Sequence, residues 1–134
     1  LIERALRDDG TSHHYRPASR YASLNPELTT PVQQACAPLS RPVYTGATWT
    51  TDAPFRETET AIERARSEGI LAVEMEAAAL YAFAETRDLP VVCFAHVTNQ
   101  LGQTDDDFEK GEADGSQDAL AVVDAAATAW RSLG

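Results

Sequence analysis

The sequence predicts an α/β fold with a mixed, largely parallel sheet flanked by helices, and two observations favour it. Residues 70–73 and 91–97 are short apolar runs of strand length, and the alanine-rich residues 77–84 between them have helix-forming composition. A strand, a helix and a second strand in so short a stretch normally pair in parallel through a right-handed crossover. Residues 118–133 add a closing amphipathic helix.

The first elements follow from turn signals. Residues 1–15 begin like the interior of a strand or helix and pass into a turn-rich stretch, residues 8–12. The pair Asn25-Pro26 marks a break, and a short helical pattern follows it to residue 37. We therefore expect a regular element, a turn and a helix in that order.

The middle of the chain carries a strand and a helix with clear ends. Residues 43–51 are rich in β-branched and aromatic side chains and are expected to form a strand, which residues 52–54 end. Residues 57–68 have helix-forming composition, and Gly69 stands where a helix C-cap would lie.

The end of the chain has a break, a loop and a helix. Leu89-Pro90 ends the alanine-rich helix, and residues 100–117 form a polar, acidic loop. In the helix predicted over residues 118–133, apolar side chains recur on one face: Leu120, Val123, Ala127 and Trp130.

Length and charge exclude several classes of protein. A chain of 134 residues with 43% hydrophobic side chains is one folded domain rather than a disordered tail. Its net charge of −10 argues against binding to nucleic-acid phosphates or to anionic lipid. No apolar run approaches the roughly 20 residues that a membrane-spanning helix needs. No spacing of histidine, cysteine and carboxylate side chains predicts a zinc or calcium site, so we expect no metal.

The two cysteines indicate a compartment. Cys36 and Cys93 are far apart, lack the CxxC spacing and follow no secretory leader. We expect two reduced thiols in a cytoplasmic protein, with a disulfide as the alternative. The chain begins at Leu1 rather than at an initiator methionine, and we expect it to be a fragment of a longer protein.

Polar residues follow three predicted strands. They are Thr50-Thr51-Asp52, Glu74-Met75-Glu76 and the stretch from His96 to Asn99. Ligands of open α/β sheets collect at the carboxyl ends of strands, so we expect a pocket there. His96, between apolar neighbours, is expected to be a hydrogen-bonded core residue rather than a ligand.

Glu74 and Glu76 allow two interpretations. Carboxylates in a first helical turn stabilise the helix dipole by about 0.3–1 kcal/mol each, which needs no ligand. However, this junction between a buried strand and an alanine-rich helix is expected to be crowded, and a carboxylate there is costly unless a donor reaches it. A vicinal diol, such as that of ribose, supplies two donors to one carboxylate.

Residues 69–81, which contain Glu-Met-Glu, resemble the signature of the nucleoside phosphorylase-I family, which includes uridine phosphorylase and hexameric bacterial purine nucleoside phosphorylase. Residues 7–15, 45–52 and 97–99 resemble flanking parts of that family, so the likeness covers nearly the whole chain. The resemblance implies that residues 1–134 are the C-terminal portion of a single phosphorylase-like α/β domain, incomplete at its N-terminus.

The resemblance also implies a reaction. A nucleoside and phosphate, the co-substrate, give a free base and ribose 1-phosphate, and no cofactor is needed. Glu76 would hold the ribose 2′ and 3′ hydroxyls, Met75 would pack under the sugar, and Glu74 would stand beside them in support. Catalysis then consists of positioning an oxocarbenium-like sugar and stabilising charge on the departing base.

The base end departs from the purine branch of the family. That branch has an aspartate as general acid at the position of Asn99, whereas an asparagine only donates or accepts hydrogen bonds. Uridine phosphorylases resemble this chain there, so we favour a uridine-type substrate. Thr51 would line the substrate site, Arg56 would bond a carbonyl of the base and Phe55 would stack on it. A surface arginine paired with a nearby glutamate is the alternative interpretation of Arg56.

No glycine-rich turn with an adjacent arginine marks a phosphate site in this chain. In the resembling family those residues precede the matched region, so we expect the partners to be a missing N-terminal half, further copies of the chain, or both. The alternatives are a non-catalytic nucleoside-binding or assembly domain, and a hydrolytic nucleosidase. The nucleosidase would require an acid that Asn99 does not provide.

Overall fold

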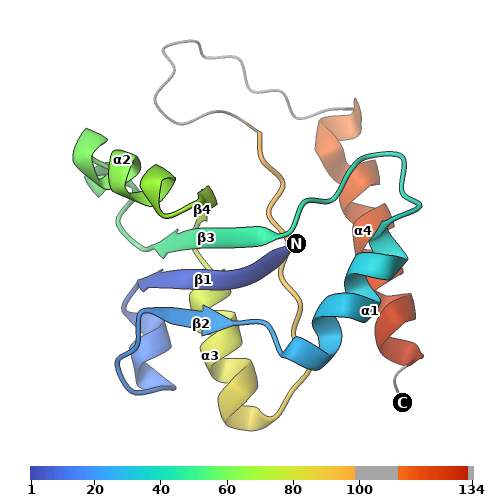
Figure 1. The fold of residues 1–134 in the computed structure, drawn as a ribbon, viewed down its shortest axis with the longest axis horizontal. Helices are drawn as coiled ribbons and strands as arrows, with labels where there is room; N and C mark the ends of the chain where they lie inside the picture. Colours follow the sequence, from blue (N-terminus) through green and yellow to red (C-terminus); the bar gives the residue numbers. More distant parts are fainter. Residues whose placement is uncertain (99–111, 133–134) are drawn as a thin grey trace.

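The computed structural model describes residues 1–98 and 112–132 and contains a four-stranded sheet (Figure 1). Its strands are β1 (Ile2–Asp8), β2 (Tyr21–Ser23), β3 (Gly46–Thr51) and β4 (Ile70–Glu74). The strand order is β2-β1-β3-β4, with β2 antiparallel to β1 and the other two pairs parallel. The predicted mixed, largely parallel sheet is confirmed.

Four helices surround the sheet: α1 (Pro26–Cys36), α2 (Glu59–Ser67), α3 (Ala77–Arg87) and α4 (Ser116–Arg131). Three short 3-10 turns, η1 (Thr11–His14), η2 (Pro54–Arg56) and η3 (Glu112–Gly115), complete the described part. Helix α3 packs with the apolar cluster that contains Ala5, whereas α2 packs with the cluster that contains Trp49. Because side chains of a strand alternate between faces, these two helices cover opposite faces of the sheet. Helices α1 and α4 lie side by side near the chain's N-terminus (Figure 1).

Local signals explain where the helices begin and end. The Asn25 side chain accepts a hydrogen bond from Glu27 N–H at 3.0 Å, and Pro26 occupies the first position of α1. Thr58 caps α2 in the same way, accepting from Ala61 N–H at 3.3 Å. Gly69, predicted to end that helix, has a φ of +73°, which glycine adopts without steric cost.

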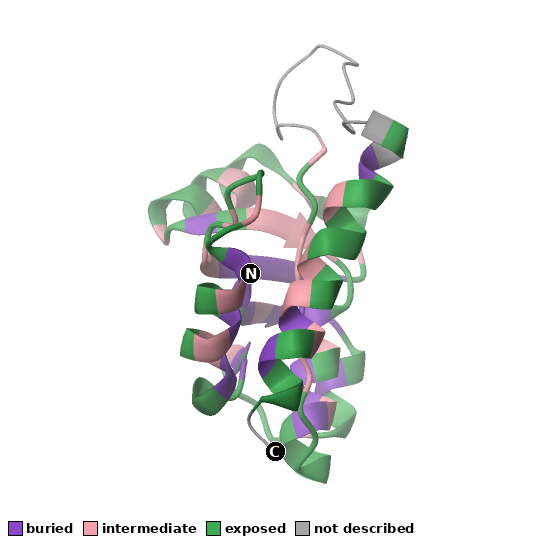
Figure 2. Ribbon diagram, turned by 90° about the vertical axis from the view of Figure 1, so that its right-hand side faces the viewer, coloured by how far each residue is buried: buried purple, intermediate pink, exposed green. Residues whose placement is uncertain are grey.

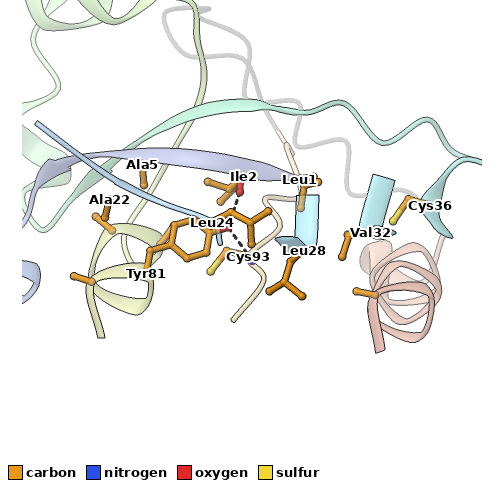
Figure 3. Close-up of a cluster of buried hydrophobic side chains, with 14 of the residues drawn as sticks. Leu1, Ile2, Ala5, Ala22, Leu24, Leu28, Val32, Cys36, Tyr81 and Cys93 are labelled. Atoms are coloured by element: carbon orange, nitrogen blue, oxygen red, sulfur yellow. Dashed lines mark hydrogen bonds between the residues drawn. The ribbon is translucent and has the colours of Figure 1, made fainter. Parts of the chain in front are cut away.

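Tyr81 joins the elements of the larger core (Figure 3). Its ring is 1% exposed, and its hydroxyl donates to the Ile2 carbonyl at 2.5 Å. The same hydroxyl accepts from Cys93 N–H at 3.1 Å. One side chain of α3 therefore ties the first residues of β1 to the segment that follows α3.

The strand predicted over residues 91–97 is wrong. Of these residues, only Cys93 makes a described backbone hydrogen bond to the sheet, accepting from Ile2 N–H at 3.0 Å. The segment runs across the strands rather than along one (Figure 1). The contact is with β1, an interior strand that already pairs with β2 on one edge and with β3 on the other, so the segment does not extend the sheet there. The apolar composition that predicted a strand reflects packing on the core.

The predicted buried face of the last helix is also wrong. Leu120, Val123 and Trp130 are 69%, 59% and 54% exposed, and Figure 2 shows the extensive exposed surface of this helix, which ends beside the label C. The residues of α4 that face the core are instead Ala125, Ala126 and Ala129. The alanine face of α4, rather than its most hydrophobic stripe, packs on the core, and small side chains are compatible with close helix packing.

Two further predictions are refined. The strand predicted from residue 43 begins at Gly46, and the acidic loop predicted over residues 100–117 falls mainly on residues outside the described ranges.

Cys36 and Cys93 are free, buried thiols. Within the described residues, no helix combines the length and apolarity that crossing a membrane would require.

Replacing Tyr81 with phenylalanine is expected to lower the free energy of unfolding by about 1–3 kcal/mol, because the Ile2 carbonyl and Cys93 N–H lose their buried partner. Urea denaturation measures the change. The control is Tyr44→Phe, at a ring that is 74% exposed, and it should stay within about 0.5 kcal/mol of the parent. Equal stability of both variants would contradict this account of the core.

Stability is expected to fall as the pH rises from 9 to 11. Burial raises the pKa of the Cys93 thiol from 9.0 to about 11, and a hydrogen bond with Tyr81 opposes this by a smaller amount. Because the pKa of the thiol is higher in the folded state than in the unfolded state, the neutral thiol stabilises the fold below pH 9. That stabilisation is lost as the pH rises from 9 through 11. The free energy of unfolding, measured by urea denaturation between pH 9 and 11, should fall by about 2 kcal/mol more for the parent than for Cys93→Ala. Parallel curves would show that the thiol is not responsible.

Candidate functional site

A hollow of about 490 Å³ runs along the whole of β4, between α2 and the segment that follows α3. We call it the β4 hollow; the polar or partly polar residues that line it include Glu57, Arg66, Glu74, Met75, His96 and Thr98. Apolar lining comes from Trp49, Ile62 and Val73 on the face of the sheet covered by α2. Its volume lies within the range of small-molecule pockets, and at Glu74 and Met75 it reaches the carboxyl end of β4, the edge of a parallel sheet where ligands collect.

Glu74 accepts hydrogen bonds from four donors, two on β3 and two at the start of α3. One carboxylate oxygen, Oε1, accepts from the hydroxyls of Thr48, at 3.0 Å, and Thr50, both on β3. The other, Oε2, accepts from the backbone N–H of Glu76 at 2.8 Å and of Ala77 at 2.6 Å. As predicted, a carboxylate at this junction needs hydrogen-bond donors, but for Glu74 the protein rather than a ligand supplies them.

Glu76 has the opposite surroundings. It is exposed, and in the described part of the chain its carboxylate accepts one hydrogen bond, from Met75 N–H at 3.3 Å. It stands at the N-cap position of α3, where its backbone carbonyl accepts from Leu80 N–H. The expectation that this side chain is crowded is therefore wrong. Glu76 does not line the β4 hollow, although its neighbour Met75 does.

The other predicted site residues are dispersed. Thr51 is 1% exposed, and its hydroxyl accepts from Ala53 N–H at 3.1 Å, which supports the turn after β3. Phe55 is fully exposed and Arg56 is exposed on η2, and neither lines the β4 hollow. His96, predicted in the core, is exposed and lines the hollow instead. Asn99 lies outside the described residues.

The loop after β1 is organised around one buried guanidinium. Arg7 is 8% exposed, and its five N–H groups meet five acceptors. Two are hydroxyls, of Ser12 at 3.0 Å and Ser19 at 2.6 Å, and two are the carbonyls of Arg16 and Pro17 at 3.1 and 2.7 Å. The fifth is His13 Nδ1 at 3.3 Å. The sequence match over residues 7–15 thus corresponds to a folded loop at the carboxyl end of β1.

This loop is linked to the next strand. Gly10 N–H donates to the Asp52 carboxylate at 2.9 Å, across the carboxyl ends of β1 and β3. Asp9 accepts from both the N–H and the hydroxyl of Ser12 at 2.7 Å. The polar ends of β1 and β3 are therefore mainly engaged with each other, which leaves the end of β4 as the open part of this edge.

Three residues that shape this edge had hydrogen-bonding roles that were not predicted: Arg7, Thr48 and Thr50, although Thr50 was named among the polar strand ends. The threonines had a detectable signal, because residues two apart in a strand share one face and β3 was predicted. Two hydroxyls on the same face, next to a strand that ends in a glutamate, indicate donors for that glutamate. Arg7 gave no comparable signal, since its acceptors are mostly backbone and hydroxyl groups of one loop.

Among the described residues, no cluster of three histidine, cysteine, aspartate or glutamate side chains could hold a metal ion. The lining of the β4 hollow offers carboxylate, guanidinium, hydroxyl and imidazole groups beside an apolar wall. Such a lining suits a small ligand that carries polar groups and a flat apolar portion.

Replacing Arg7 with lysine is expected to lower the free energy of unfolding by about 2–4 kcal/mol, because an ammonium group cannot reach five acceptors placed around a planar fork. Chemical denaturation measures the loss. Arg87→Lys, at an exposed position in the last turn of α3, serves as the matched control and should remain within about 0.5 kcal/mol of the parent. If the two substitutions cost the same, Arg7 does not organise the loop.

Comparison with solved structures identifies the fold. The AMP nucleosidase from Bacteroides thetaiotaomicron superposes with a TM-score of 0.58 at 24% sequence identity, over 67% of this chain and 40% of that chain. The P. knowlesi homologue of P. falciparum PNP gives a TM-score of 0.57 at 24% identity, over 66% of this chain and 38% of that chain. The present chain thus matches about two fifths of the length of these proteins.

A protein-family model matches more of the chain than the solved structures do. No curated protein matches the chain. Residues 1–133, however, match the family described as the phosphorylase superfamily. The match includes the strand–turn–helix segment around Glu74 and Glu76 that carried the resemblance in the sequence. Because it extends over nearly all of the chain, this protein belongs to the phosphorylase superfamily.

Proposed function

We propose that this chain forms part of a nucleoside phosphorylase, which cleaves the N-glycosidic bond of a nucleoside with phosphate to give a base and ribose 1-phosphate. The observation that carries the proposal is the match to the phosphorylase superfamily over residues 1–133. The β4 hollow, which runs along β4 and reaches Glu74 and Met75 at its carboxyl end, supports it.

The ribose is assigned to Glu76 and Met75. Within the described part of the chain, Glu76 accepts one hydrogen bond at 3.3 Å, so its carboxylate keeps acceptor capacity for two sugar hydroxyls. Charge-assisted hydrogen bonds of this kind contribute roughly 1.5–3 kcal/mol each. Met75, which is 47% exposed and lines the hollow, provides an apolar surface for the sugar ring.

The chemical step breaks the bond between the anomeric carbon and the base nitrogen and forms a bond from that carbon to a phosphate oxygen. The electron pair of the broken bond leaves with the base, and the sugar passes through an oxocarbenium-like state. The protein contributes position and charge: Glu76 fixes the sugar, and Asn99 hydrogen-bonds the departing base. Arg56 and Phe55 are assigned to the base edge and face, which requires them to approach the hollow when substrate binds.

A uridine-type substrate is favoured over a purine because Asn99 does not transfer a proton at neutral pH, whereas a uracil leaving group is stabilised by hydrogen bonds to its carbonyls. The partners of the chain are the nucleoside, phosphate, and the remainder of a phosphorylase fold or further copies of the chain. The two free thiols, Cys36 and Cys93, support a cytoplasmic location.

The reaction class is tested by release of base, measured by chromatography, from uridine and from inosine with and without phosphate, using the full-length gene product. We expect phosphate-dependent release of uracil and slower release of hypoxanthine. Release that does not need phosphate would establish a hydrolytic nucleosidase instead. Binding without release would establish a nucleoside-binding domain.

The sugar assignment is tested with the 134-residue chain itself, by calorimetric titration with uridine and with 2′,3′-dideoxyuridine. Glu76→Gln should weaken uridine binding by about tenfold or more and leave dideoxyuridine binding unchanged, because only uridine has the diol. Glu63→Gln, at an exposed position on α2, is the matched control and should change neither affinity. Unaltered uridine binding by Glu76→Gln would refute the assignment.

A further inference from the structure

The two glutamates that flank Met75 differ in how much of their acceptor capacity the protein uses. A carboxylate offers about four lone-pair sites. Glu74 accepts four hydrogen bonds, from two hydroxyls and two backbone N–H groups. Glu76 accepts one within the described part of the chain. The first carboxylate is therefore saturated, and the second is open.

We propose that Glu74 is a positioning residue that does not touch the sugar: with Thr48 and Thr50 it holds the turn between β4 and α3 so that the Glu76 carboxylate meets the ribose hydroxyls. This inference rests on the proposed function, since it concerns how the ribose is held. The two carboxylates then have different roles: Glu74 bonds to the protein, and Glu76 binds the ligand.

The bonds to Glu74 constrain the backbone around Glu76. The N–H of Glu76 and that of Ala77 both donate to Oε2 of Glu74, at 2.8 and 2.6 Å. These two peptide groups lie immediately before and after the Cα of Glu76. Their common acceptor therefore fixes the direction in which the Glu76 side chain leaves the backbone.

Thr50 extends this hold to the sheet. It is fully buried, and its hydroxyl donates to Oε1 of Glu74 while accepting from Ala78 N–H at 3.0 Å. One hydroxyl of β3 thus contacts both the end of β4 and the first turn of α3. Thr48 adds a second donor to the same oxygen at 3.0 Å. The turn is therefore attached to an interior strand rather than to a surface loop.

The rival arrangement, in which Glu74 itself binds the ribose, is costly. To accept from a sugar hydroxyl, Glu74 would have to release one of its four donors. Thr50 is completely buried and Thr48 is 3% exposed, so a released hydroxyl would have no access to water. Glu76 gives up nothing comparable, because it is exposed.

The test compares substitutions that remove or keep one hydroxyl. Thr50→Val is nearly isosteric with threonine and cannot donate, whereas Thr50→Ser keeps the donor. The measurement is the ratio of the affinities for uridine and 2′,3′-dideoxyuridine, which reports only the contribution of the diol. We expect Thr50→Val and Glu74→Gln to lower this ratio by about tenfold and Thr50→Ser to restore it. Thr45→Val, just before β3 and bonded to Gln33 instead, is the control and should leave the ratio unchanged.

Amide hydrogen exchange of the unliganded chain separates positioning from binding. Thr50→Val and Glu74→Gln should speed exchange at residues 76–78 by about tenfold, because those amides lose an acceptor or its support. Glu76→Gln should leave these rates unchanged while abolishing the preference for uridine. A role in stability alone would lower the denaturation midpoint without changing the affinity ratio of the folded variants.

The inference is overturned if folded Thr50→Val and Glu74→Gln keep the parent's affinity ratio. It is equally overturned if Glu74→Gln loses the preference for uridine while Glu76→Gln keeps it, since Glu74 would then be the ligand. If the full-length gene product neither binds nor cleaves either nucleoside, the proposed function fails. The exchange rates at residues 76–78 then still decide whether Glu74 holds the turn.

Discussion

The carboxylate of Glu74 determines the geometry of the junction on which the candidate site depends. It lies at the last position of β4, faces two hydroxyls of β3 and accepts the first free N–H groups of α3. Helix N-termini leave several N–H groups without intrahelical partners, and an anionic acceptor there also complements the helix dipole. One side chain therefore accepts from two N–H groups at the start of the helix and joins the ends of two strands.

The sequence predicted the sheet and its helices well because those elements carry local signals. Gly69, Asn25 and Thr58 have backbone or capping roles that act within a few residues of their own position. The strand predicted over residues 91–97 failed for a different reason. Apolar composition indicates that a segment is packed against the core, but whether it pairs as a strand depends on whether it runs alongside the edge of another strand, which a single segment does not reveal.

The face of α4 failed for a related reason. Leu120, Val123 and Trp130 form the most hydrophobic stripe of the helix, yet the helix contacts the core through Ala126 and Ala129. Periodicity shows which residues share a face but does not measure how closely two helices approach. In the candidate site, the Glu-Met-Glu motif was found from its position after a strand. The donors to Glu74 were not found, because hydrogen-bond partners on a neighbouring strand depend on register.

The spacing of Glu74 and Glu76 shows how one short motif can serve two purposes. In a continuous strand, residues two apart point to the same face, so both carboxylates would compete for Thr48 and Thr50. Here β4 ends at Glu74, and Glu76 takes the N-cap position of α3, with a φ of −130° and a ψ of −32°. After the change from strand to helix, the second carboxylate is exposed and accepts a hydrogen bond from Met75 N–H, whereas the first bonds to β3 and α3. Lengthening β4 by one residue pair would bring two like charges to one set of donors, so the point at which the strand ends is itself part of the site.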